Sequence, residues 1–334
     1  MIKIGIVGLG RIGKLHLFNI QHHIPGACVV AACSRTEKSL EYAKKHGVKR
    51  LFTSFKTMLS QGGIDAVIIA SPTALHFEHL QLAVCARKHI FCEKPIDLSL
   101  ENTQEIKKLL DANPVKFMVG FNRRYDPNIL KIKKELNAGR LGVTQSVTLI
   151  SRDPGPPPME FIKTSGGLFL DMAIHDFDLA SYLMNSEIME VFTTASIFGK
   201  LPLKTVGDVD TAVTILKFKN KGFATIENSR NSTYGYDQRV EVFGEKGLLS
   251  TQNMTDDTVA FADCNGFHFP KPMGFFIERY KDSYLNILTS FISCLAQNKE
   301  PELTFQDGLK SLVISLAAKK SSLENRKVLL SEII

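Results

Sequence analysis

The fold is decided by the stretch Ile4-Gly5-Ile6-Val7-Gly8-Leu9-Gly10-Arg11-Ile12-Gly13, close to the start of the chain. Residues 3–7 read as a buried strand and residues 14–21 as the helix that follows it. The GxGxxG at their junction allows a tight turn, a close backbone approach to a pyrophosphate and close helix–strand packing. The helix N-terminus adds amide donors and the positive end of its dipole. The junction therefore predicts a dinucleotide site, formed by Gly8, Gly10, Arg11, Ile12 and Gly13.

The length, the apolar pattern and the charge of the chain limit its class and its partners. At 334 residues, about two domains are expected. No apolar run is long enough for a transmembrane helix, and the first strand leaves no room for a signal peptide, so we expect a cytoplasmic protein without membrane contacts. The net charge of +7 is not gathered into a basic block with interleaved aromatics. We therefore expect no nucleic-acid partner.

Cysteine and histidine spacing predicts no metal site. The six cysteines form no CxxC pair, and we interpret them as reduced and structural. His76 and His79 lie three apart on a predicted helix, but no matching cysteine or carboxylate set accompanies them.

Strands and helices alternate over the first third of the chain. The predicted strands are 2–7, 28–33, 65–70, 89–92 and 116–120, and the predicted helices are 12–22, 36–46, 54–60, 74–87 and 99–111. This alternation predicts a parallel, doubly wound sheet. Ser71, Pro72 and Thr73 end the third strand, and His76 follows on the next helix. Strand ends of this kind face the ligand crevice of open α/β sheets, so these residues are candidate cofactor contacts.

The pattern changes after about residue 120. A helix from Asp126-Pro127 to about residue 137 is followed by predicted strands 144–152, 189–198, 209–219, 222–230 and 238–244. Because no helices separate most of these strands, an open mixed or antiparallel sheet is expected. One helix is predicted at 167–184, a loop at 153–158, and two C-terminal helices near 274–297 and 306–319. We expect a dinucleotide-binding domain over 1–121 and a substrate and oligomerisation domain over 122–334, whose C-terminal helices can pack back on the first.

The tip of the second strand bears on the choice between NAD and NADP. An acidic residue at this tip usually binds the ribose 2′-hydroxyl of NAD. Here the tip reads Ser34-Arg35, and Glu37 already belongs to the predicted helix. Because arginine pairs well with phosphate oxygens, the tip favours NADP or the use of both cofactors. In the alternative, Arg35 stacks on the adenine and NAD binds.

Two further motifs carry chemistry. Glu93-Lys94-Pro95 follows a strand end, where the lysine is expected to point into the ligand crevice. The proline fixes the backbone there and allows a cis peptide bond. Asp171, His175 and Asp178 share one face of a predicted helix. Because such a face is costly to pack against an apolar core, it predicts a polar pocket.

In this order, these motifs resemble those of the glucose–fructose oxidoreductase, inositol dehydrogenase and rhizopine-catabolism family, called Gfo/Idh/MocA. The resemblance covers essentially the whole chain and rests also on residues 119–124 and on Gly166-Gly167. It implies a Rossmann domain followed by an open-sheet domain, whose outer face commonly forms homodimers or homotetramers. The spacing of Lys94, Asp171, His175 and Asp178 is most similar to that of the inositol 2-dehydrogenases.

The resemblance implies a role for each residue of the catalytic set. His175 is expected to be the general base, Lys94 to bind the reacting oxygen, and Asp171 to orient the pair. Glu93 and Asn122 are expected to line the nicotinamide pocket, and Lys94 is expected to contact the cofactor as well as the substrate. The other expected polyol ligands are Arg124, Asp153, Asp178 and Tyr236, with Tyr234 as the alternative to Tyr236. The expected activity is NAD(P)-dependent oxidation of a ring hydroxyl of a polyol or sugar. Another sugar dehydrogenase or reductase, an NAD-dependent glycosidase and a non-enzymatic dinucleotide sensor are the alternatives.

Overall fold

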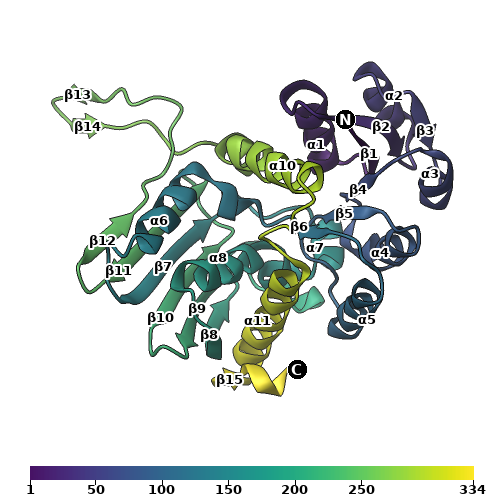
Figure 1. The fold of residues 1–334 in the computed structure, drawn as a ribbon. Coiled ribbons are helices and arrows are strands. Elements are labelled where there is room, and N and C mark those ends of the chain that lie inside the picture. The colour runs from purple at the N-terminus through teal and green to yellow at the C-terminus, as the bar shows by residue number, and fades with distance from the viewer. The chain divides into compact units, whose positions relative to one another are not determined.

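The computed structural model describes residues 1–334, which form two compact units (Figure 1). The first unit comprises Met1–Tyr125 and Asp282–Leu312, and the second comprises Asp126–Lys281 and Val313–Ile334. No helix combines the length and the apolar character that a bilayer-spanning helix needs.

The first unit is built on a six-stranded parallel sheet. Its strands are β1 (Ile2–Val7), β2 (Ala27–Cys33), β3 (Arg50–Phe52), β4 (Ala66–Ile69), β5 (His89–Cys92) and β6 (Phe117–Val119). Their order, β3-β2-β1-β4-β5-β6, is that of a doubly wound dinucleotide-binding fold, so the predicted sheet is confirmed. Only β3 was not predicted, because three partly exposed edge residues carry no clear pattern.

Helices cover this sheet and connect its strands. They are α1 (Arg11–His23), α2 (Glu37–Lys45), α3 (Phe55–Gln61), α4 (His76–Cys85) and α5 (Leu100–Asp111), with short 3₁₀ turns η1 (Thr73–Leu75) and η2 (Asn122–Tyr125). Side chains set several of the helix starts: Ser54 accepts a hydrogen bond from the Thr57 amide, and Ser99 accepts one from the Asn102 amide. Strand β4 is buried along its whole length, as expected for the centre of a parallel sheet.

The second unit holds a seven-stranded mixed sheet. Its strands are β7 (Thr144–Arg152), β8 (Ile188–Ser196), β9 (Thr211–Phe218), β10 (Phe223–Ser229), β11 (Asp237–Gly244), β12 (Gly247–Ser250) and β15 (Val328–Leu329). The order is β12-β11-β7-β10-β9-β8-β15, in which β7 and β10 run parallel and the other neighbours run antiparallel. The expected mixed sheet is therefore confirmed, and β12 and β15 are short edge strands that the pattern did not reveal.

The remaining helices agree with their predictions only in part. They are α6 (Pro127–Asn137), α7 (Met159–Ser165), α8 (Ile174–Met184), α9 (Phe276–Arg279), α10 (Lys281–Ala296) and α11 (Phe305–Glu324), with short turns η4 (Leu203–Val206) and η5 (Leu330–Glu332). The helix predicted at 167–184 is present, but its first part is a π-helical turn, η3 (Leu168–Ala173), and only the remainder, α8, is α-helical. The helix predicted at 274–297 is likewise divided into α9 and α10.

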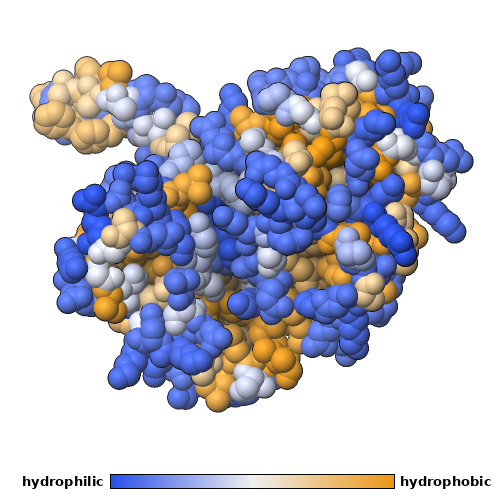
Figure 2. Space-filling model, viewed as in Figure 1, coloured by the Kyte–Doolittle hydropathy of each residue, from blue (hydrophilic) through white to orange (hydrophobic).

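A hairpin extends from the second unit as an arm (Figure 1). Its strands β13 (Phe261–Asp263) and β14 (Gly266–His268) pair only with each other. Phe261, Phe267 and Phe269 are exposed on this arm, which forms an apolar surface in Figure 2.

Candidate active site

The glycine loop between β1 and α1 is closely packed at both ends and open in the middle. A Cβ on Gly8 would lie 2.4 Å from the Ser71 nitrogen, and one on Gly13 would lie 1.9 Å from the Gly8 oxygen. A Cβ on Gly10 would meet nothing within 4 Å. The absence of a side chain at Gly8 and Gly13 therefore allows close packing of the backbone. Gly10 borders open space with room for a pyrophosphate.

The N-terminus of α1 is suited to an anion. Gly10 occupies the cap position without a side-chain hydrogen bond, and no acidic residue stands in the first turn, which begins with Arg11 and Ile12. The first amides of the helix are thus not capped by a side chain and lie at the positive end of the dipole. These residues fit the diphosphate of a dinucleotide.

The tip of β2 carries hydroxyl groups and a cation. Ser34 accepts a hydrogen bond from the Thr36 amide at 3.4 Å, and Thr36 Oγ1 donates to Ser39 Oγ at 2.8 Å. Arg35 is exposed, and Glu37 is the first residue of α2, as expected. The tip itself therefore has no carboxylate for a ribose 2′-hydroxyl.

Two histidines of α4 organise the end of β4. His76 is buried, and its two ring nitrogens lie 2.8 Å from the Pro95 oxygen and 2.9 Å from the Ser71 oxygen. Burial, as the main cause, lowers the pKa of His76. His79 Nδ1 lies 2.9 Å from Ser71 Oγ, and burial lowers the pKa of His79 to about 4. His76 thus joins the Ser71-Pro72-Thr73 segment to the loop that carries Lys94.

The loop after β5 is held by a buried contact with α1. The Lys94–Pro95 peptide is cis. His16 Nε2 lies 2.6 Å from Glu93 Oε1, and the His16 side chain is completely buried. Gly120 leaves room for the same carboxylate, because a Cβ there would lie 2.9 Å from Glu93 Oε2. Glu93 is therefore fixed from two sides, next to Lys94.

Asn122 and Arg124 contact the C-terminal segment of the first unit. Asn122 Nδ2 donates to Ser283 Oγ at 2.8 Å, and Arg124 Nη2 pairs with Asp307 Oδ1 at 2.9 Å. Burial raises the pKa of Asp307, but the Arg124 cation and hydrogen bonds from Thr304 outweigh it, so that the pKa lies below its usual value.

In the second unit, Asp171 and His175 lie on either side of a π-to-α junction. Gly166 and Gly167 both have positive φ and end α7, after which η3 begins. Asp171 lies in η3 and His175 in the first turn of α8. Asp178, further along α8, is buried. The expected set is therefore present on one continuous helical segment, whose π-helical turn is a feature often found at functional sites.

An arginine that sequence reasoning missed holds this segment. Arg230 follows β10 and is only 1% exposed. Its Nη2 lies 3.4 Å from Asp171 Oδ2, and its Nη1 lies 3.2 Å from Asp208 Oδ2. Asp208 Oδ1 in turn accepts the Leu168 amide at 2.8 Å. No local pattern marks these partners, because they are 59 and 22 positions from Arg230.

Asp176, next to His175, was also missed. It is buried and accepts hydrogen bonds from Ser151 Oγ at 2.7 Å and from Asn228 Nδ2 at 2.7 Å. Ser151 lies on β7 and Asn228 on β10. Asp176 therefore anchors the start of α8 to the sheet and limits the positions that His175 can take.

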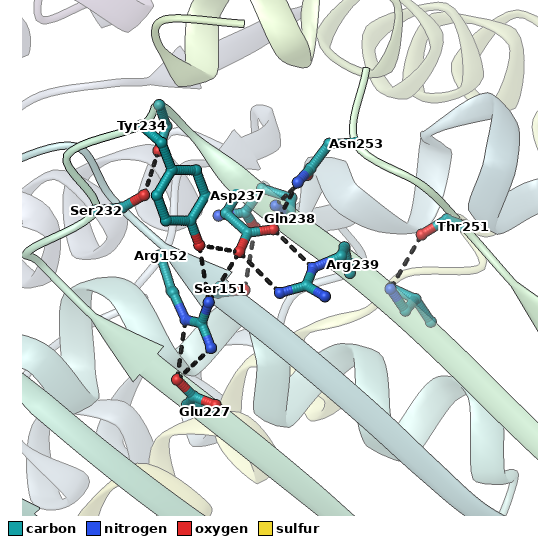
Figure 3. A network of polar contacts seen from close by, with 12 residues as sticks. Ser151, Arg152, Glu227, Ser232, Tyr234, Asp237, Gln238, Arg239, Thr251 and Asn253 are labelled. Carbon is teal, nitrogen blue, oxygen red and sulfur yellow. Dashed lines mark hydrogen bonds and ion pairs between the residues drawn. The ribbon is translucent and has the colours of Figure 1, made fainter. Parts of the chain in front are cut away.

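The two candidate tyrosines have different surroundings, and Figure 3 shows those of Tyr234. Tyr234 Oη donates to Asp237 Oδ2 at 2.6 Å, in a network that also binds Arg152, Arg239 and Asn253 to that carboxylate. Tyr236 is buried and packs edge-to-face on Tyr280. Tyr234 thus belongs to a structural network.

Asp153, directly after β7, is held through its backbone. Its amide donates to the Ser229 oxygen at 2.8 Å, and its carbonyl accepts the Ser232 amide at 2.9 Å. The backbone of this candidate polyol ligand is therefore fixed at the end of the sheet.

Comparisons with known proteins agree with this arrangement. Residues 2–121 match the model described as the oxidoreductase family with an NAD-binding Rossmann fold, and residues 129–250 match the GFO/IDH/MocA C-terminal domain. The chain is 39% identical to the myo-inositol 2-dehydrogenase of Thermotoga maritima, with 100% of both chains covered. It is 36% identical to the inositol 2-dehydrogenase of Rhizobium meliloti, with 98% of both covered.

Solved structures extend the likeness to three dimensions. A probable dehydrogenase from Thermotoga maritima superimposes with a TM-score of 0.97 at 40% identity, covering 99% of this chain and 100% of that one. The scyllo-inositol dehydrogenase of Lactobacillus casei, solved with NAD(H) and scyllo-inositol, has a TM-score of 0.93 at 32% identity, covering 99% of both. With both family domains matched and relatives aligned over their full length, the chain belongs to the Gfo/Idh/MocA family of NAD(P)-dependent oxidoreductases.

Proposed function

We propose that this protein is an inositol 2-dehydrogenase, which oxidises a ring hydroxyl of an inositol to a ketone with NAD(P) as the hydride acceptor. The observation that carries the proposal is the presence of the motif residues Lys94, Asp171 and His175 in a chain with full-length inositol dehydrogenase relatives. The open space at Gly10 and the absence of a side-chain cap on α1 support dinucleotide binding in the same chain.

In the proposed reaction, three side chains act on one secondary alcohol. Lys94 donates a hydrogen bond to the hydroxyl oxygen and stabilises the negative charge that develops there. His175 removes the hydroxyl proton on a ring nitrogen, and Asp171 orients that ring. The bound nicotinamide supplies the acceptor for the hydride of the carbinol carbon. The products are a ketone, the reduced cofactor and a proton on His175, which passes to solvent.

Several finer features are part of this proposal. Glu93 and Asn122 would support the nicotinamide side, whereas the polyol would contact Arg124, Asp153, Asp178 and Tyr236. The Ser34-Arg35 tip would accept NADP or both cofactors, since a guanidinium pairs well with a 2′-phosphate. The outer face of the second unit's sheet would form a homodimer or homotetramer, because Val213, Ile215 and Phe192 are exposed there. We expect the protein to act in the cytoplasm.

The test is a binding titration followed by a turnover panel. NADH and NADPH are titrated separately against the purified protein by nicotinamide fluorescence, and NAD and NADP are then each assayed with myo-inositol, scyllo-inositol and a set of aldoses. Turnover of an inositol supports the proposal, and the preferred cofactor reports on the Ser34-Arg35 tip. Turnover of aldoses alone would replace inositol with another sugar substrate, and tight binding without turnover would favour a dinucleotide sensor.

An NAD-dependent glycosidase is the alternative activity that uses the same cofactor. It would need a further acid to protonate a leaving group. Release of a phenol from aryl glycosides in the presence of the cofactor would identify that activity, and its absence would count against it.

A further inference from the structure

We propose that Arg230 is a positioning residue that holds the carboxylate of Asp171 in place for catalysis, with Asp208 as its second anchor. The inference rests on the proposed function, in which Asp171 orients His175. Neither Arg230 nor Asp208 belongs to the set that the family motifs indicate.

The guanidinium of Arg230 connects two segments of the second unit. One amino group, Nη1, lies 3.2 Å from Asp208 Oδ2, in the loop before β9. The other, Nη2, lies 3.4 Å from Asp171 Oδ2, in the π-helical turn η3. Because Arg230 is only 1% exposed, little water can compete for these contacts.

Asp208 also fixes the start of the same turn. Its Oδ1 accepts the amide of Leu168, the first residue of η3, at 2.8 Å. The absence of a side chain at Gly167 provides the space, because a Cβ there would lie 2.3 Å from Asp208 Oδ1. The turn is thus held at two points: Leu168 through Asp208, and Asp171 through Arg230.

The charge and the shape of arginine both suit this role. A guanidinium remains protonated in proteins, so it provides a fixed cation for Asp171. Its planar fork presents separate N–H groups to two carboxylates, whereas the ammonium of lysine is a single point charge. Substitution of Arg230 by lysine therefore preserves the charge and removes the bridge.

The consequence for catalysis passes through Asp171. An ion pair to a buried arginine restricts the rotamer of Asp171 and thereby the geometry with which it can orient His175, four residues later. Loss of the bridge should lower kcat more than it raises KM, because the base is misplaced while the remaining polyol contacts persist.

A double-mutant cycle tests the inference. The effect of Arg230→Lys on kcat is measured in the wild-type background and in the Asp171→Asn background. The matched control is Arg239→Lys, which changes an arginine that pairs with a different aspartate, Asp237. In the wild-type background we expect Arg230→Lys to lower kcat by about tenfold or more. In the Asp171→Asn background we expect the same substitution to lower kcat by less than about threefold. An equal loss of kcat in both backgrounds would show that Arg230 contributes only to the fold, and it would overturn the inference.

A substitute variant and a second measurement cover the cases in which the first experiment cannot be read. If Arg230→Lys does not fold, as judged by circular dichroism, Asp208→Asn enters the same cycle, because it removes one anchor and leaves the guanidinium. If the wild type oxidises no polyol or sugar, the proposed function fails, and the ring NMR signals of His175, assigned with His175→Gln, decide instead. A shift in Arg230→Lys similar to that in Asp171→Asn supports positioning, and unchanged signals refute it.

Discussion

His16 Nε2 lies 2.6 Å from Glu93 Oε1, although the two residues are 77 positions apart. His16 belongs to α1, which follows the glycine loop, and Glu93 precedes Lys94 in the loop after β5. The contact joins the helix proposed to bind the cofactor phosphates to the loop that presents the proposed catalytic lysine. Because the His16 side chain is fully buried and that of Glu93 is 12% exposed, neither group can readily bind water instead.

Substitution of His16 by alanine should destabilise the first unit and weaken cofactor binding. The largely buried Glu93 carboxylate would lose a donor, at a cost of about 1–3 kcal/mol. Thermal unfolding and NADH titration measure the two effects. His22→Ala, on the exposed side of the same helix, is the control and should behave like the wild type. Equal melting temperatures for His16→Ala and the wild type would show that the contact adds no stability.

Two glycines of the same loop should respond differently to alanine. Gly13→Ala places a Cβ 1.9 Å from the Gly8 oxygen, so it should lower the melting temperature. Gly10→Ala meets nothing within 4 Å, so it should fold normally. It should weaken NADH binding by about tenfold, because the added methyl group would occupy the space proposed for the pyrophosphate. Calorimetry of both variants with and without NADH separates the effects. A Gly10→Ala protein that binds NADH like the wild type would exclude close approach at this position.

Removal of the proposed base or the proposed lysine should abolish most turnover, whereas the remaining cofactor contacts should keep the protein able to bind NADH. We expect His175→Gln and Lys94→Met each to lower kcat by about 10²–10⁴-fold, since each removes a group that acts in the transition state. Steady-state kinetics and NADH fluorescence report on the two properties, with Lys219→Met in an exposed hairpin turn as the control. Retention of more than about a tenth of the wild-type rate by His175→Gln would mean that another group takes the proton.

Asp237 should make stability depend on pH in the acidic range. Burial raises its pKa, but hydrogen bonds from Arg239, Tyr234 and Asn253 outweigh this and hold the pKa below its usual value. A carboxylate with a lowered pKa stabilises the fold fully above its unfolded pKa of about 3.9, and the stabilisation is lost as the pH falls through the lower folded value.

The variant Asp237→Asn tests that dependence. It should lose about 1–3 kcal/mol at neutral pH, and its urea midpoint should fall less steeply than that of the wild type below about pH 4. Urea unfolding across this range measures both, with Asp256→Asn at an exposed position as the control. Parallel profiles for Asp237→Asn and the wild type would assign the acid sensitivity to other carboxylates.

The exposed face of the second sheet should set the oligomeric state. Val213 and Ile215 on β9 point outward, whereas their neighbours in the strand are buried. Ile215→Lys places a charge in the proposed interface, so light scattering after size exclusion should report a smaller assembly. Leu323→Lys, on α11, is a control at another exposed apolar position. An unchanged mass for Ile215→Lys would locate the interface elsewhere.

Local sequence patterns were sufficient for most of the architecture. The glycine loop after an apolar run and the alternation of strand and helix predicted the doubly wound sheet, because both signals arise from neighbouring residues. The long strands of the second sheet were likewise predicted from their own residues, as β9 illustrates with its alternating burial. Lys94, Asp171 and His175 were named from motifs, and their shared catalytic role remains a prediction.

Only the tertiary structure decided how the Asp171 segment is held. The π-helical turn η3 depends on Asp208, Arg230 and the space at Gly167, which are distant in sequence and carry no common local pattern. In the same way, His16 and Glu93, which are 77 positions apart, become partners only in the folded first unit, where α1 meets the loop after β5. Periodicity records which face of a segment is buried, whereas the pairing of buried charges is set by contacts between segments, and a sequence alone does not reveal those.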